Sequence, residues 1–193
     1  MTALIAGLLV FLGIHSLNML APALRNRMVD RLGLLGWKGV FALISLIGFG
    51  MLVWGYGEAR SAPVWLWQSP VWTRHLASLL MLPAMILLVA TYVPGTRIKA
   101  RIGHPMLLAT KVWALAHLVA NGTLADLILF GAFLAWAVAG FIVFRRRDRA
   151  SGRQYPVAGL ARDIAAIAGG VILWGLFAFH LHRLLIGVAP FGG

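Results

Sequence analysis

Histidines are the side chains of this sequence whose type and position could do chemistry. His15 and His117 lie well inside long apolar runs, where a polar ring needs a partner. One interpretation is an interhelical hydrogen bond to a Ser, a Thr or a backbone carbonyl, which is common between membrane helices. The other is ligation of a metal ion or of a haem iron, because neutral imidazole is a common metal ligand. The remaining histidines are His75, His104, His180 and His182.

The segment from His104 to Thr123 is an apolar run that carries polar side chains on two helical faces. Thr110, Trp113 and His117 share one face, because residues three, four and seven apart stack along a helix. His104 and Lys111 share another. A charged residue at the centre of a membrane helix costs about 2.5–3.5 kcal/mol on insertion scales. We therefore expect Lys111 either to snorkel inward or to face the His104 side and meet a carbonyl or an anionic group such as a haem propionate.

Composition predicts an integral membrane protein. The 193 residues are 61% hydrophobic and only 11% charged, with a mean hydropathy of +0.89, whereas a soluble domain has about a quarter of its residues charged. The net charge of +12 indicates basic loops that face anionic lipid, and we expect no nucleic-acid partner. The absence of cysteine excludes disulfides, iron–sulfur clusters, a thiolate haem ligand and covalent c-type haem attachment.

Six apolar runs approach the roughly 20 residues that cross a bilayer. They predict an all-α bundle of six transmembrane helices in a single domain over residues 1–193. The fourth run is short, so its ends are expected to extend. The predicted spans are Ala3–Ala21, Trp37–Tyr56, Arg74–Tyr92, Pro105–Ala120, Leu124–Phe144 and Ile164–Val188.

The basic residues predict the orientation of these spans. Thirteen of the 17 Lys and Arg lie in or directly beside the three odd-numbered loops, which are residues 22–36, 93–104 and 145–162. Four follow the first span, including Lys38 at the start of the second, three follow the third span and six follow the fifth. Because positive loops stay in the cytoplasm, both chain termini are expected on the opposite side. The run from Arg145 to Arg149 is interpreted as an anchor on the cytoplasmic side.

Several other features predict structural roles. His75, His180 and His182 lie near the outward ends of spans and are expected at the interface, as is the Trp-rich segment of residues 62–72. It stays open whether His104, His180 or His182 replaces one of the proposed haem ligands. His104 precedes Pro105, a helix-start signal, and can serve as a cap. In the last span, Gly169, Gly170 and Gly175 are expected to allow close packing, and Asp163 suits the start of a helix. Gly122 and Thr123 are expected to end one helix and cap the next.

Haem b is the cofactor that these residues suit best. A zinc or di-iron site would lack ligands, because there is no cysteine and the acids lie in loops or at helix ends. Two axial histidines in apolar, glycine-rich and aromatic surroundings suffice for haem b. We expect His15 and His117 to ligate the iron, with His104, Lys111 and Trp113 around the cofactor. Gly13 and Ala114 leave room for a flat macrocycle. The expected ligand at the iron is apolar or a small gas.

Several blocks of the chain resemble the NnrU family, small bacterial inner-membrane proteins associated with denitrification and nitrogen-oxide metabolism. This resemblance implies an inner-membrane location with periplasmic termini. The family is similar to zeta-carotene isomerase, a haem b enzyme, which implies that His15 and His117 are axial ligands and that His104 is also needed. Ala114 stands where the isomerase has a cysteine. The blocks are Gly13-Ile14-His15-Ser16-Leu17, Leu24-Arg25, His104-Pro105-Met106, Val112-Trp113-Ala114-Leu115-Ala116-His117-Leu118 and Asn121-Gly122-Thr123-Leu124-Ala125-Asp126-Leu127.

A second resemblance keeps other functions open. The basic segment that leads into His104-Pro105 is similar to that of membrane methyltransferases, in which a His-Pro block helps to hold S-adenosylmethionine. Those enzymes usually carry Arg before the block, where this chain has Gly103. The remaining classes are a haem-dependent isomerase or oxidoreductase, a haem-bearing sensor or accessory protein, and an assembly protein without a cofactor. No nucleophile–base pair identifies catalytic residues.

Overall fold

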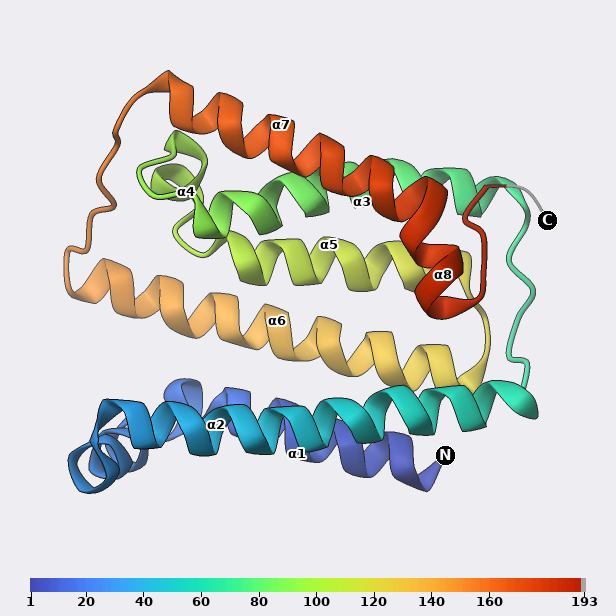
Figure 1. Cartoon of the computed structure of the whole chain (residues 1–193), viewed down its shortest axis with the longest axis horizontal. Coiled ribbons are helices and arrows are strands. Elements are labelled where there is room, and N and C mark those ends of the chain that lie inside the picture. The colour runs from blue at the N-terminus through green and yellow to red at the C-terminus, as the bar shows by residue number, and fades with distance from the viewer. Residues whose placement is uncertain (192–193) are drawn as a thin grey trace. The chain divides into compact units, whose positions relative to one another are not determined.

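The computed structural model describes residues 1–191 and consists of helices joined by short connections (Figure 1). Within these residues there is no strand, and one isolated bridge joins Trp65 to Thr123. The predicted all-α class is confirmed. The helices are α1 (Thr2–Leu20), α2 (Pro22–Ser61), α3 (Trp72–Tyr92), α4 (Arg97–Ile102), α5 (Pro105–Ala120), α6 (Leu124–Ala150), α7 (Leu160–Leu176), the π-helical turn η1 (Phe177–Leu181) and α8 (His182–Ile186).

Five of these stretches are long and apolar enough to cross a membrane, so the chain is a multi-pass membrane protein. They are α1, α2, α3, α6 and the continuous stretch Leu160–Ile186. The sixth expected span corresponds to α5, which has 16 residues and the predicted bounds. The expected extension of this helix at both ends is therefore wrong, and the count of six spans stays a prediction.

The segments predicted as cytoplasmic loops contain more helix than expected. Residues 22–32 begin α2, because Pro22 occupies a first-turn position that suits proline. The helix direction breaks at Gly33, whose φ of 71° and ψ of 164° favour a residue without a Cβ. Residues 97–102 form α4, and α6 continues through the arginine run to Ala150. Clustered charges thus lie on helix ends as well as in loops.

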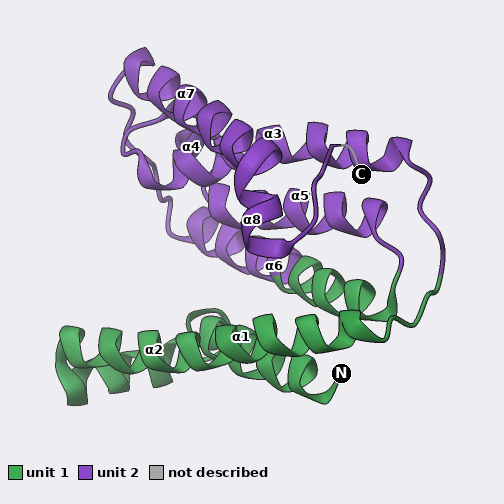
Figure 2. Cartoon of the chain, turned by 45° about the vertical axis from the view of Figure 1, so that its right-hand side comes forward, with its two compact units in different colours: residues 1–66, 123–136 green, residues 67–122, 137–193 purple. Residues whose placement is uncertain are grey.

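The chain divides into two compact units, which are described separately (Figure 2). Unit 1 comprises residues 1–66 and 123–136. Its core contains Leu4, Leu8, Leu52, Ala59 and Ala125, and α1 packs along α2. Glycines make the approach close: a Cβ at Gly55 would lie 2.3 Å from the Leu4 nitrogen, and one at Gly48 would lie 2.8 Å from the Phe11 nitrogen. Such close packing through small residues is the usual way in which membrane helices associate.

The start of α6 is fixed by a capping arrangement within unit 1. Asp126 Oδ2 accepts hydrogen bonds from the Thr123 nitrogen at 3.0 Å and from Thr123 Oγ1 at 2.6 Å. The Asp126 nitrogen donates in return to Thr123 Oγ1, which confirms Thr123 as the cap. Tyr56 donates to Asp126 Oδ1, and this bond ties α2 to α6. A buried acid with this many donors is a structural feature.

Unit 2 comprises residues 67–122 and the chain from 137 onwards. In it, α3 packs against α5 and α7. A Cβ at Gly170 would lie 2.4 Å from the Ile86 Cα, and one at Gly169 would lie 3.1 Å from Val89 Cγ1, so these glycines allow the predicted close packing. A Cβ at Gly175 would meet no atom within 4 Å, so the same expectation is wrong there.

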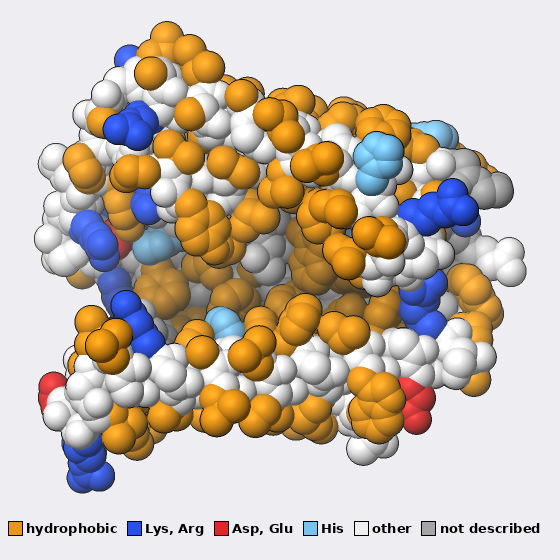
Figure 3. Space-filling view, in the orientation of Figure 1, with side chains coloured by type: hydrophobic (Ala, Val, Ile, Leu, Met, Phe, Trp, Pro, Cys, Tyr) orange, Lys and Arg blue, Asp and Glu red, His pale blue; other side chains and the backbone are white. Residues whose placement is uncertain are grey.

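The exterior of both units is apolar. Leu9 is 71% exposed, Leu46 67% and Trp54 66%. Figure 3 shows hydrophobic side chains over most of each unit on the face in view, with Lys and Arg near the helix ends. A soluble monomer rarely presents this much continuous apolar surface. The exposed side chains therefore indicate a lipid bilayer as the environment.

Candidate functional site

The polar face of α5 that carries His104 and Lys111 packs against the second half of α6. Lys111 Nζ lies 3.7 Å from the ring centroid of Phe141, and the His104 ring lies 5.4 Å from that of Phe144. The predicted alignment of His104 with Lys111 therefore meets a matching face on α6. Lys111 thus contacts an aromatic ring, and its expected pairing with an anionic ligand group stays a prediction.

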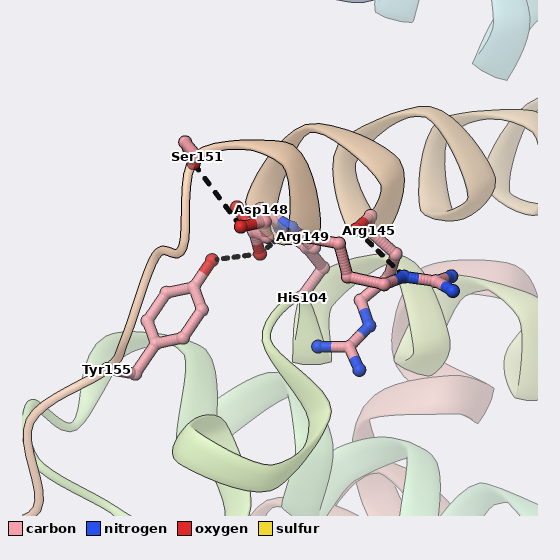
Figure 4. Close-up of polar contacts among 6 residues, drawn as sticks. All are labelled: His104, Arg145, Asp148, Arg149, Ser151 and Tyr155. Carbon is pink, nitrogen blue, oxygen red and sulfur yellow. Dashed lines mark hydrogen bonds and ion pairs between the residues drawn. The ribbon is translucent and has the colours of Figure 1, made fainter.

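His104 belongs to a polar cluster that Figure 4 shows in detail. Its Nε2 lies 2.9 Å from Asp148 Oδ2, an ion-pair distance without the alignment of a hydrogen bond. Tyr155 donates its hydroxyl proton to the same Oδ2 at 2.9 Å. Both side chains are largely buried, since 19% of the His104 side chain and 9% of the Asp148 side chain are exposed. We name His104, Asp148 and Tyr155 the His104 cluster.

Local backbone geometry brings these three side chains together. Gly103 ends α4 with a φ of 81°, which turns the chain so that Pro105 can begin α5. His104 is the N-cap residue, but its side chain makes no capping hydrogen bond, so the expected capping role is limited to its backbone. Asp148 lies in the last turn of α6, where its backbone carbonyl accepts hydrogen bonds from the Ser151 hydroxyl and the Arg153 backbone nitrogen.

Tyr155 lies in the connection between α6 and α7 and is held in its protonated form. Burial, the hydrogen bond to Asp148 and the negative charge of that carboxylate raise its pKa above the ordinary value of 10.0. The nearby Arg153 and Arg145 lower the pKa by a smaller amount. Tyr155 is therefore a hydrogen-bond donor to Asp148 at neutral pH.

His117 lies on the other polar face of α5 with Trp113, as the spacing predicts. Its Nδ1 lies 2.8 Å from the Trp113 carbonyl oxygen, and the two rings are 5.3 Å apart. The ring of His182 lies 6.4 Å from that of His117, with 23° between their planes. His182 Nδ1 lies 2.7 Å from the Val188 carbonyl oxygen. His182 was expected at the interface, with its replacing a proposed haem ligand left open, and its ring lies beside His117 directly after the π-helical turn.

His15 lies in unit 1 among aromatic side chains. Its Nδ1 is 2.6 Å from the carbonyl oxygen of Phe11, and the Phe11 ring stacks on it at 4.2 Å. Phe41 and Trp136 approach the imidazole edge-on at 4.9 and 6.4 Å. The indole nitrogen of Trp136 donates to Ser16 Oγ at 3.0 Å, which fixes α6 against α1 beside this histidine.

The predicted site residues thus fall into three groups. His104 and Lys111 share the α5 face that meets α6, Trp113 and His117 share the other face, and His15 belongs to unit 1. Within residues 1–191, no three His, Asp or Glu side chains are grouped as ligands of a metal ion.

Asp148 and Tyr155 were missed as site residues because the arginine run was interpreted only as an anchor. The signal that could have revealed Asp148 is that it is the one acid in that run.

Comparison with known proteins identifies the family. The model of the NnrU protein family matches residues 3–190, nearly the whole chain. The chain belongs to the NnrU family. No curated protein and no solved structure matches it. The match is continuous across both units, and the single transmembrane domain expected for an NnrU protein stays a prediction.

Proposed function

We propose that this NnrU protein binds haem b in the bacterial inner membrane, with His15 and His117 as axial ligands. One observation made on both histidines supports the proposal. In each, Nδ1 lies at hydrogen-bond distance from the backbone carbonyl oxygen four residues earlier. The tautomer with its proton on Nδ1 carries the lone pair on Nε2. Metal-ligating histidines almost always have their second nitrogen fixed in this way.

The surroundings of both histidines fit a porphyrin. His15 is bordered by the rings of Phe11 and Phe41, and His117 by that of Trp113. A Cβ at Gly13 would have no atom within 4 Å, which leaves space beside His15, whereas Ala114 beside His117 is fully buried by its neighbours. Apolar walls exclude water and favour a flat hydrophobic macrocycle, and nearby cations suit its propionates. Lys111 is the cation of unit 2 proposed to face these acidic groups, and His104 is proposed to lie near the cofactor on the same face of α5.

Bound haem would supply redox chemistry or the binding of a small gaseous ligand, and we propose nitrogen-oxide metabolism as its setting. The chain's own part is to fix the axial imidazoles, exclude water with aromatic side chains and neutralise the propionates. Ala114 stands where the related isomerase has a cysteine, so nitrogen-oxide chemistry or sensing is favoured over isomerisation of a polyene.

His182 is a second candidate for one axial position. The His182 ring lies 6.4 Å from that of His117, with 23° between their planes. Because neutral imidazole is a common metal ligand, His182 is a second histidine that would hold the iron beside His117, and it is tested beside His15.

Optical spectra of the detergent-purified protein, oxidised and reduced, test the proposal. We expect a Soret band in the wild type, altered or lost in His15→Ala and His117→Ala but retained in His182→Ala and in the control His75→Ala. Loss in His182→Ala with retention in His15→Ala would transfer the second axial position to His182. A band that survives both His15→Ala and His117→Ala would reject the ligand assignment.

A protein that stays colourless after haem supplementation would reject haem binding altogether. The functions then left are a membrane assembly protein and a methyltransferase. Binding of S-adenosylmethionine by the purified protein, measured calorimetrically, separates these two. The His104-Pro105 start of α5 is the feature that the methyltransferase interpretation would use.

A further inference from the structure

Asp148 differs from the other buried acids of the chain in where it lies on its helix. Asp126 and Asp163 are in the first turns of α6 and α7, where the helix dipole favours a negative charge. Both also accept backbone N–H groups, from Thr123 and Ile98. Asp148 is only 7% exposed and lies in the last turn of α6, where the dipole disfavours it.

The partners of Asp148 explain why a carboxylate can stay buried at that position. Tyr155 donates to Oδ2, and the imidazole of His104 meets the same oxygen. A Cβ at residue 103 would lie 3.0 Å from Arg145 Nη1 and 3.4 Å from Asp148 Oδ2, so the arginine side chain ends on the same side of Gly103 as the carboxylate. A buried carboxylate needs donors or nearby positive charge, because its desolvation is otherwise costly. The hydrogen bond comes from Tyr155 in the α6–α7 connection, and the close contact comes from His104 at the N-cap of α5.

We infer that Asp148 and Tyr155 are positioning residues that hold His104 as a proton acceptor, with the proton on Nε2 and the lone pair on Nδ1. A carboxylate beside one imidazole nitrogen selects the tautomer with its proton there. Tyr155 fixes the carboxylate by donating to it. A ligand group that donates to Nδ1 gives up its proton there, and the resulting imidazolium is stabilised by Asp148. The reverse transfer restores both groups.

The chemical class served is a bound molecule with an acidic proton or a hydrogen-bond donor. The inference rests on the proposed function, because that function supplies the bound ligand. The tautomer of His104 can nevertheless be measured on the protein with or without haem. A purely structural ion pair between His104 and Asp148 predicts a different species, an imidazolium with protons on both nitrogens. The tautomer therefore separates a positioned proton acceptor from a structural ion pair.

Nitrogen-15 NMR of the full-length protein with labelled histidine, in detergent at pH 8, provides the test. His104→Gln assigns the signal. In the wild type we expect the Nε2-protonated tautomer. In Asp148→Asn the preference should be lost and both tautomers should appear, and Tyr155→Phe should have a smaller effect. Ser151→Ala is the matched control, because the Ser151 hydroxyl donates to the Asp148 carbonyl and not to its carboxylate, and its removal should leave the tautomer unchanged.

Three results would overturn the inference: an imidazolium in the wild type, a proton on Nδ1, or a tautomer that is unchanged in Asp148→Asn. If Asp148→Asn fails to fold, Tyr155→Phe decides the question, since it removes only one hydroxyl, and an unchanged tautomer there contradicts the inference. Optical spectra of the same samples report haem separately. A colourless protein with the expected tautomers would contradict the proposed function. It would still support the positioning of His104 by Asp148 and Tyr155.

Discussion

Replacing Gly55 by alanine should separate α1 from α2 and destabilise unit 1. The new Cβ would lie 2.3 Å from the Leu4 nitrogen and 2.7 Å from the Ala3 carbonyl carbon. Ordinary contact begins near 3.4 Å, so α1 must withdraw by about 1 Å, and overpacking of this kind costs about 1–3 kcal/mol. Both obstructing atoms are backbone, so no side-chain rotation can relieve the clash.

The matched control is Gly57→Ala on the same helix. A Cβ there would meet no atom within 4 Å, and alanine stabilises a helix by up to about 1 kcal/mol relative to glycine. Unfolding in mixed detergent micelles, followed by circular dichroism, should therefore show Gly55→Ala less stable and Gly57→Ala unchanged or more stable. Equal stability of the two variants would refute the close approach of α1 and α2.

The same pair of variants connects packing to the proposed cofactor. His15 lies on α1 about 16 Å along the axis from Leu4, and its aromatic neighbour Phe41 lies on α2. A shift of α1 therefore changes the surroundings of the imidazole. We expect Gly55→Ala to lose part of the bound haem at equal protein concentration and Gly57→Ala to keep it. Equal haem content in a destabilised Gly55→Ala would show that His15 tolerates the shift.

Three further predictions follow from other parts of the chain. A reporter fused after residue 193 should be active in the periplasm, and activity only in the cytoplasm would refute the orientation. Tyr155 keeps its proton in the folded state above pH 10.0, where an unfolded tyrosine loses it, so stability should fall as the pH rises above 10.0. In Tyr155→Phe that dependence on pH should weaken, as thermal unfolding can measure. Lys111→Met should lower haem affinity with little effect on unfolding, and normal affinity would contradict an anionic partner of Lys111.

The faces of α5 could be predicted from sequence, whereas their partners could not. The helical repeat alone places His104 with Lys111 and Trp113 with His117. The α6 residues that contact the face of His104 and Lys111 are more than 25 positions away in the sequence. Nothing in the local sequence indicates which face of α6 packs against α5. Asp148 was interpreted with the arginines around it, because a charge run is usually solvated, yet the last turn of α6 buries it.

The position of His182 beside His117 could not be derived from the sequence for a different reason. A regular α-helix from Leu160 onwards predicts the direction of each side chain by 3.6-residue periodicity. The five residues Phe177–Leu181 form a π-helical turn instead, and the wider repeat rotates every later side chain. His182 follows this turn directly and lies beside His117. Single π-helical turns occur often at functional sites, which is a further reason to include His182 in the haem titration.

Lys111 shows how energies decide between its two predicted roles. Its charge costs about 2.5–3.5 kcal/mol at the centre of a membrane helix. A desolvated cation over an aromatic ring gains about 2 kcal/mol, and Lys111 Nζ lies 3.7 Å from the Phe141 centroid. The ring offsets most of the cost, and partial access to water or headgroups can meet the rest. Stability therefore does not require an anion at Lys111, so a loss of haem affinity in Lys111→Met without a loss of stability would indicate a role in binding.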